Sequence, residues 1–100
     1  MSKITLNDVI KEQIEADADF SIAYQRELLI NAISKMVIEL RQSQQITQKE
    51  LAEKAGTTQP VIARLESGSN DRVPSLDLLE RIAVASHARL NIEFEIMDSA

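Results

Sequence analysis

The side chains with the clearest capacity for specific chemistry are Gln59 and Arg64, which lie in the segment Thr47–Gly68. Each carries several hydrogen-bonding atoms in one plane, and these suit the edges of bases: Gln favours adenine and Arg favours guanine. Helical spacing places Ile62 and Leu65 together on the opposite face. The pattern predicts a short helix with a buried side and an outer side able to read DNA bases.

Catalytic and metal-binding sites are not indicated. The chain has a single histidine, His87, and no cysteine. No Ser/Asp constellation accompanies His87 at helical spacing, and a histidine at a helix end tolerates the left-handed conformation. The carboxylate pairs Asp17/Asp19 and Glu93/Glu95 are better explained as helix caps and the solvated side of a strand. We therefore predict no enzymatic activity, no cofactor and no metal.

Two short helices around a tight turn must position the candidate base-reading residues. Thr47 and Glu50 have the spacing of a capping box, in which each side chain bonds the other residue's amide. Gly56 stands where the chain reverses and predicts a left-handed turn residue. Thr58 is expected to cap the next helix, with Pro60 in its first turn. Two helices joined in this way are typical of a helix-turn-helix.

The remaining segments predict further helices. We expect one over Ser2–Ala16, a break at Asp17–Asp19 where an Asp caps the next helix, and a long helix over Phe20–Ser43. Ser69–Pro74 reads as a loop, and Ser75 caps a last helix that ends near His87. Four apolar residues of this last helix are expected to complete the core: Leu76, Leu79, Ile82 and Ala83.

Apolar and polar residues alternate along Leu90–Ile96, and this repeat of two residues predicts a half-buried strand. Its apolar positions are Leu90, Ile92, Phe94 and Ile96. A lone strand in a helical domain has unpaired backbone groups. We expect it to pair antiparallel with the same strand of a second copy, which makes a homodimer. The edge of another protein's sheet and a tail lying over the core are the alternatives.

Composition indicates one soluble domain of 100 residues with a net charge of −5. Residues 1–30 and 91–100 each carry −3, whereas residues 31–90 carry +1. We divide the chain into an acidic helical extension (1–30, partner binding), a DNA-binding helix-turn-helix domain (31–88), and a strand and tail (89–100). No apolar run suggests a membrane span or a signal peptide, and the lack of cysteine suits the cytoplasm.

The segment Thr47–Gly68 resembles lambdoid phage repressors and the wider XRE (Cro-type) family. The resemblance is carried by Gln48, Ala52, Gly56, Thr58-Gln59, Ile62, Leu65 and Glu66-x-Gly68. It implies a mainly α fold, a five-to-six-helix bundle of the lambda-repressor-like helix-turn-helix type, here with one short C-terminal β-strand. The third helix of this family enters the major groove. Pro60 departs from the family, because phage repressors have a second base-reading polar residue there.

The resemblance also implies roles for individual residues. Arg41 and Glu66 are expected to form a largely buried ion pair, and Gln48 to anchor a phosphate through the N-terminus of its helix. The expected DNA-binding residues are Gln48, Thr57, Thr58, Gln59, Ala63, Arg64, Ser67, Ser69 and Arg72.

The flank before the helix-turn-helix resembles HigA-type antitoxins, through Asp19-Phe20, Tyr24 and Glu27. This resemblance implies a protein that represses its own operon at double-stranded operator DNA and holds a small basic endoribonuclease, a HigB-like toxin, inactive. The expected toxin-binding residues are Glu12, Glu15, Asp19, Phe20 and Tyr24. Two alternatives remain: a stand-alone XRE-family regulator with no toxin, and an interaction module that has lost DNA binding. RNA binding ranks lower.

Overall fold

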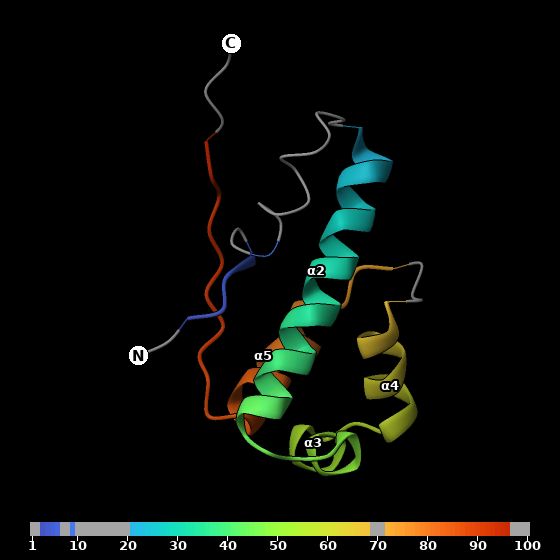
Figure 1. Ribbon diagram of the computed structural model, residues 1–100, viewed down its shortest axis with the longest axis vertical. Helices are drawn as coiled ribbons and strands as arrows, with labels where there is room; N and C mark the ends of the chain where they lie inside the picture. Colours follow the sequence, from blue (N-terminus) through green and yellow to red (C-terminus); the bar gives the residue numbers. More distant parts are fainter. Residues whose placement is uncertain (1–2, 7–8, 10–20, 69–71, 97–100) are drawn as a thin grey trace.

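The computed structural model describes residues 3–6, 9, 21–68 and 72–96, and four helices lie within them (Figure 1). The long α2 spans Ile22–Ser43, and α3 (Gln48–Ala55) and α4 (Gln59–Ser67) follow it as a pair. The last helix, α5, spans Leu76–Ala85. Helices α3, α4 and α5 gather around the C-terminal half of α2 (Figure 1).

The N-cap of α2 is a serine rather than an aspartate. The Ser21 hydroxyl accepts a hydrogen bond from the amide of Tyr24 at 3.2 Å. The predicted start at Phe20 is therefore too early, and the predicted Asp cap is wrong. Serine caps helices as well as aspartate does, and here it stands directly before the first helical residue.

The caps of α3 are those that the sequence predicts. The amide of Glu50 donates to the Thr47 hydroxyl and the amide of Thr47 donates to the Glu50 carboxylate, both at 3.0 Å. Gly56 ends the helix in the left-handed conformation, with φ 68°. This local chemistry fixes both ends of a helix only 8 residues long, which is too short to be stable alone.

Thr58 is the N-cap residue of α4, as predicted, and Pro60 lies in the first turn of the helix. The Thr58 side chain makes no capping hydrogen bond, so that part of the prediction is wrong. Proline already holds the backbone near a helical φ, and α4 therefore starts without the hydroxyl. Gly68 ends the helix with φ 68°.

Helix α5 and the turn after it follow most of the sequence pattern. The Ser75 hydroxyl accepts from the amide of Leu78 at 3.1 Å, as predicted, and His87 takes a left-handed φ of 54°. Leu76, however, is 60% exposed and lies outside the core, contrary to prediction. It is the first residue of the helix, beside the solvent-exposed cap, and Leu78 packs against the core instead.

The core lies where α2, α3, α4 and α5 meet. Leu51 and Ile62 are fully buried, and Ile82 is 2% exposed. Burying a side chain of this size stabilises a fold by about 1.5–3 kcal/mol. The other members of this cluster are Ile33, Val37, Ala52, Ala55 and Leu65.

The two ends of the chain differ from the predicted bundle. The described residues hold four helices, fewer than the five to six predicted; of Ser2–Ala16 only residues 3–6 and 9 are described, with Leu6 helical and packed against the core. Residues 88–96 form no strand, and Phe94 and Ile96 are 97% and 92% exposed. The strand prediction is wrong for a single chain, because the described residues offer no neighbouring strand with which residues 88–96 could form a ladder.

Candidate nucleic-acid interface

Helix α4 has two chemically distinct sides. Ile62 is 0% exposed and Leu65 is 4% exposed, and both pack in the core. Gln59 and Arg64 are exposed on the outer side of the same helix. Core packing thus fixes the rotation of α4 and leaves its two planar hydrogen-bonding side chains in solvent.

The other expected DNA-binding residues differ in exposure. Thr58, Ser67 and Arg72 are exposed, while Gln48, Thr57 and Ala63 are half-buried. The Ser67 hydroxyl donates to the carbonyl of Arg64 at 2.8 Å. Ser69 lies outside the described residues.

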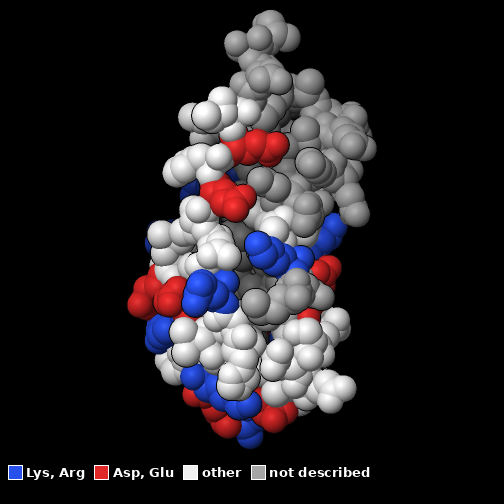
Figure 2. All heavy atoms as spheres, turned by 90° about the vertical axis from the view of Figure 1, so that its left-hand side faces the viewer, with Lys and Arg blue, Asp and Glu red and all other residues white. Residues whose placement is uncertain are grey.

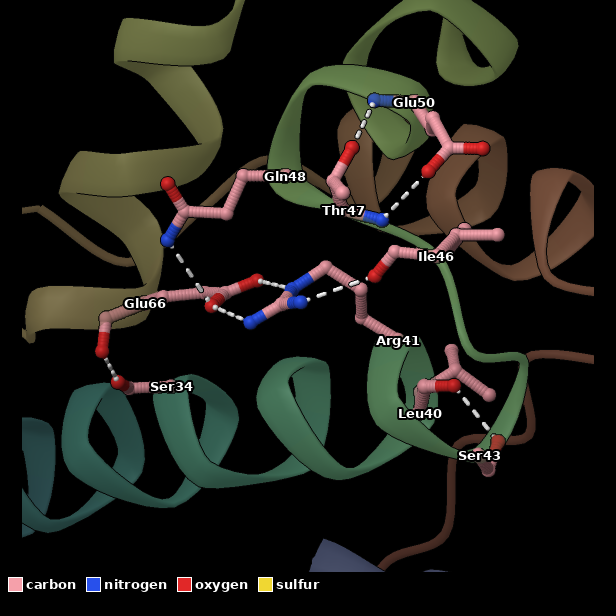
Figure 3. A network of polar contacts seen from close by, with 9 residues as sticks. All are labelled: Ser34, Leu40, Arg41, Ser43, Ile46, Thr47, Gln48, Glu50 and Glu66. Carbon is pink, nitrogen blue, oxygen red and sulfur yellow. Dashed lines mark hydrogen bonds and ion pairs between the residues drawn. The ribbon is translucent and has the colours of Figure 1, made fainter.

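The side chain of Gln48 faces inward. Its Nε2 donates to Oε1 of Glu66 at 3.2 Å, which links the start of α3 to the end of α4 (Figure 3). Gln48 is the first residue of α3, so its backbone amide has no carbonyl one turn back to donate to. The side chain is therefore committed to the fold, and the backbone amide is the group suited to an anion.

The ion pair expected between Arg41 and Glu66 is present. Nε and Nη2 of Arg41 donate to the two carboxylate oxygens of Glu66 at 2.8 and 3.0 Å, in a bidentate pair (Figure 3). Nη1 donates to the carbonyl of Ile46 at 2.9 Å. The hydrogen bond to Glu66 raises the pKa of Arg41, which therefore stays charged. One guanidinium thus joins α2, the α2–α3 connection and α4.

The end of α4 is also held to α2 by contacts that the sequence did not reveal. The Ser34 hydroxyl donates to the backbone carbonyl of Glu66. A Cβ at Gly68 would lie 3.1 Å from Oδ1 of Asn31, closer than most real Cβ contacts. Ser34 is 5% exposed between the apolar Ile33 and Val37, and a serine inside an apolar stripe is the signal that could have identified it.

Charge is mixed rather than segregated on the side of the molecule turned away from α4. Figure 2 shows basic and acidic side chains interspersed there, without one large patch of either sign. The net charge of −5 is therefore not balanced by a broad cationic surface on that side.

The residues expected to bind partners are described only in part. Of the predicted toxin-binding set, Glu12, Glu15, Asp19 and Phe20 lie outside the described residues, and Tyr24 is half-buried on α2. Leu90 is half-buried, whereas Ile92 is 61% exposed.

Two further properties concern the described part of the chain. Within it, no three His, Cys, Asp or Glu side chains are placed to hold a metal ion. None of its helices combines the length and the apolar character that crossing a membrane requires.

Comparison with known proteins agrees with this geometry. Residues 37–85 match a protein-family model described as Helix-turn-helix.

Two relatives, each named Antitoxin HigA1, come from Mycobacterium tuberculosis strains CDC 1551 / Oshkosh and ATCC 25618 / H37Rv. Each is 32% identical over 87 residues, covering 87% of this chain and 57% of the relative. The chain thus spans little more than half the length of these relatives. No solved structure matches the chain significantly. Residues 37–85 are therefore similar to the helix-turn-helix family, and the chain is similar over 87 residues to the HigA1 antitoxins.

Proposed function

We propose that this protein is a cytoplasmic antitoxin-like repressor that binds its own operator DNA and neutralises a small basic RNase, a HigB-like toxin. The observation that carries the DNA-binding half is the two-sided α4, locked to α2 by Glu66 with Gln59 and Arg64 in solvent. The likeness to HigA antitoxins supports the toxin-binding half.

DNA would be read from the start and the outer side of α4. Gln59 and Arg64 would contact base edges in the major groove, and each good bidentate contact discriminates by about 1–3 kcal/mol. The Thr58 hydroxyl, unused in capping, would lie at the groove edge. The amide of Gln48 and the N-terminus of α3 would hold a phosphate.

Two copies would be needed for tight, specific binding. Single helix-turn-helix units bury little surface, and dimers span half-sites about 34–36 Å apart. In the described residues, the exposed Ile92, Phe94 and Ile96 form the densest run of solvent-exposed large apolar side chains. We propose that this C-terminal segment is covered by the same segment of a second copy.

The toxin would bind elsewhere, on the acidic residues 1–30. These carry a net charge of −3 and would complement the cationic surface with which an RNase holds RNA phosphates. Deleting residues 1–20 should abolish co-purification with a co-expressed toxin and preserve DNA binding. Loss of both activities would assign residues 1–20 to the fold rather than to the partner.

The DNA-binding half is tested by binding to the DNA upstream of the gene. Affinity for this DNA should exceed affinity for a scrambled duplex by about 10³-fold or more. The preference should persist as salt is raised, while non-specific binding weakens steeply. Equal affinity for both duplexes at every salt concentration would reject the repressor and favour a pure interaction module. A repressor with no toxin gene beside it would instead be a stand-alone regulator.

A further inference from the structure

Arg81 of α5 reaches across to the turn between α3 and α4. Its Nη1 donates to the carbonyl of Gly56 at 3.1 Å. Its Nε lies 3.2 Å from Oδ2 of Asp77, one helical turn earlier in α5. Asp77 thus orients the guanidinium, and the guanidinium holds a backbone carbonyl of the turn.

The peptide group that Arg81 holds is bonded on both of its polar sides. The carbonyl of Gly56 and the amide of Thr57 belong to the same planar unit. The amide of Thr57 donates to the carbonyl of Ala52 in α3 at 2.9 Å, while the carbonyl of Gly56 accepts from Arg81 in α5. A cation is also well placed there, because the C-terminal end of α3 carries partial negative charge. This one peptide plane is therefore held by α3 through its amide and by α5 through its carbonyl.

This peptide plane lies just before the N-terminal end of α4, which we call the reading end because its residues Thr58 and Gln59 are proposed to face DNA. Thr58 is the N-cap of α4 and Gln59 is its first residue. Gly56 has a left-handed φ of 68°, a conformation that glycine leaves easily. A rotation of the plane would therefore change the direction in which the chain enters α4 and would move Gln59.

The ion pair between Arg81 and Asp77 contributes little to stability. The side chain of Arg81 is 45% exposed and that of Asp77 is 80% exposed. Exposed ion pairs are screened by solvent and contribute little to the free energy of unfolding. We therefore expect the contacts of Arg81 to affect the geometry of the α3–α4 turn more than the free energy of unfolding.

We infer that Arg81, oriented by Asp77, is a positioning residue that sets the reading end of α4 for sequence-specific DNA binding. This inference rests on the proposed function of α4. Arg81 acts through the turn, without itself contacting a base or a phosphate.

Arg81→Gln is the first test. We expect operator affinity to fall roughly three- to tenfold, the factor that loss of one well-placed hydrogen bond gives. Affinity for a scrambled duplex should fall less, so the ratio of operator affinity to scrambled-duplex affinity should decrease. The melting temperature should stay close to that of the wild type. The slope of log affinity against log salt should be unchanged. A slope reduced by about 0.9 would mean that Arg81 binds a phosphate directly, which overturns the inference.

Asp77→Asn is a second test, because long-range electrostatics and the positioning of Arg81 predict opposite changes in DNA affinity for this variant. Removing a negative charge from an acidic protein strengthens DNA binding if long-range electrostatics decides. On the positioning account the same variant weakens operator binding, because Arg81 loses its orientation. Glu80→Gln is the matched control: it makes the same charge change on the exposed side of α5 and should not weaken binding. The double variant Arg81→Gln/Asp77→Asn should bind no more weakly than Arg81→Gln alone.

Amide exchange separates this inference from the proposed function. The amide of Thr57 should exchange faster in Arg81→Gln than in the wild type, without DNA present. If the wild type shows no operator preference, the proposed function fails, and this exchange rate still tests the turn. Unchanged exchange, or unchanged operator affinity in Arg81→Gln, overturns the inference.

Discussion

The helix-turn-helix and the C-terminal segment have equally regular sequence patterns and very different structures. In Thr47–Gly68 the predicted capping box of α3, the left-handed Gly56 and the apolar side of α4 are all present within one chain, and only the side-chain cap at Thr58 is missing. In Leu90–Ile96 apolar and polar residues alternate as in a strand, yet all but Leu90 are exposed and no strand forms. A helix satisfies its own backbone, whereas a strand needs a neighbour.

This difference separates what a sequence pattern can and cannot specify. The capping box of α3 and the left-handed Gly56 and His87 were predictable because their causes lie within a few residues. The Arg41–Glu66 pair, 25 residues apart, came from a family resemblance and not from local pattern.

Other features depended on tertiary contacts that no local pattern specifies. Ser34, which binds the end of α4, and Arg81, which binds the turn, are polar residues whose partners lie far away in sequence. The exposure of Leu76 depends on which side of α5 meets the core. The candidate reading side of α4 was predictable because it is simply the side opposite the apolar one.

The largest expected effect is on the ion pair that ties α4 to α2. Glu66→Ala leaves the half-buried guanidinium of Arg41 and the side-chain amide of Gln48 without the carboxylate that they share. We expect a loss of about 3–5 kcal/mol in the free energy of unfolding, measured in urea. Glu39→Ala, an exposed charge on α2, is the control and should change little. An unchanged melting temperature for Glu66→Ala would show that the pair is not structural.

A pair of apolar truncations compares the two regions directly. Leu51 is 0% exposed in the core, whereas Phe94 is 97% exposed in the C-terminal segment. Leu51→Ala should cost about 2–5 kcal/mol, and Phe94→Ala should stay within about 0.5 kcal/mol at concentrations where the protein is monomeric. Similar losses in both variants would mean that the segment packs on its own chain.

The cap of α3 should have a smaller effect. Thr47→Ala removes the acceptor for the amide of Glu50 and should cost about 1 kcal/mol, measured by thermal unfolding. Thr57→Ala is the control, because its hydroxyl is not part of the capping box. A melting temperature unchanged by Thr47→Ala would show that core packing alone sets the start of α3.

The same cap predicts a pH dependence. Hydrogen bonds from the backbone amide and the hydroxyl of Thr47 lower the pKa of Glu50. A lowered pKa in the folded state gives stability that is present above the ordinary carboxyl value, about 4.3, and lost as pH falls through the folded value. Glu50→Gln keeps an acceptor but does not titrate, so its stability should fall less steeply below pH about 4.5 than that of the wild type. Parallel pH profiles would contradict the assignment.

Truncation after His87 should have the smallest effect on the fold and a clear one on association. In the part of the chain that the structure describes, the core cluster includes none of residues 88–96, so the melting temperature of the monomer should hardly change. Sedimentation should show a monomer where the full chain is a dimer, and operator affinity should fall while toxin binding persists. A truncated protein that remains dimeric would place the dimer contact on the helices.

The central claim is that the exposed side of α4 reads DNA bases, and Arg64→Ala tests it most directly. Operator binding should be measured by fluorescence anisotropy for the wild type, Arg64→Ala and Lys35→Ala, which removes the same charge from the exposed side of α2. Each duplex in the set should carry one substituted base pair. Arg64→Ala should lose about 1–3 kcal/mol and become indifferent to one base pair that the wild type discriminates. Lys35→Ala should keep every preference. If Arg64→Ala retains both the affinity and all the base preferences of the wild type, α4 does not read DNA as described.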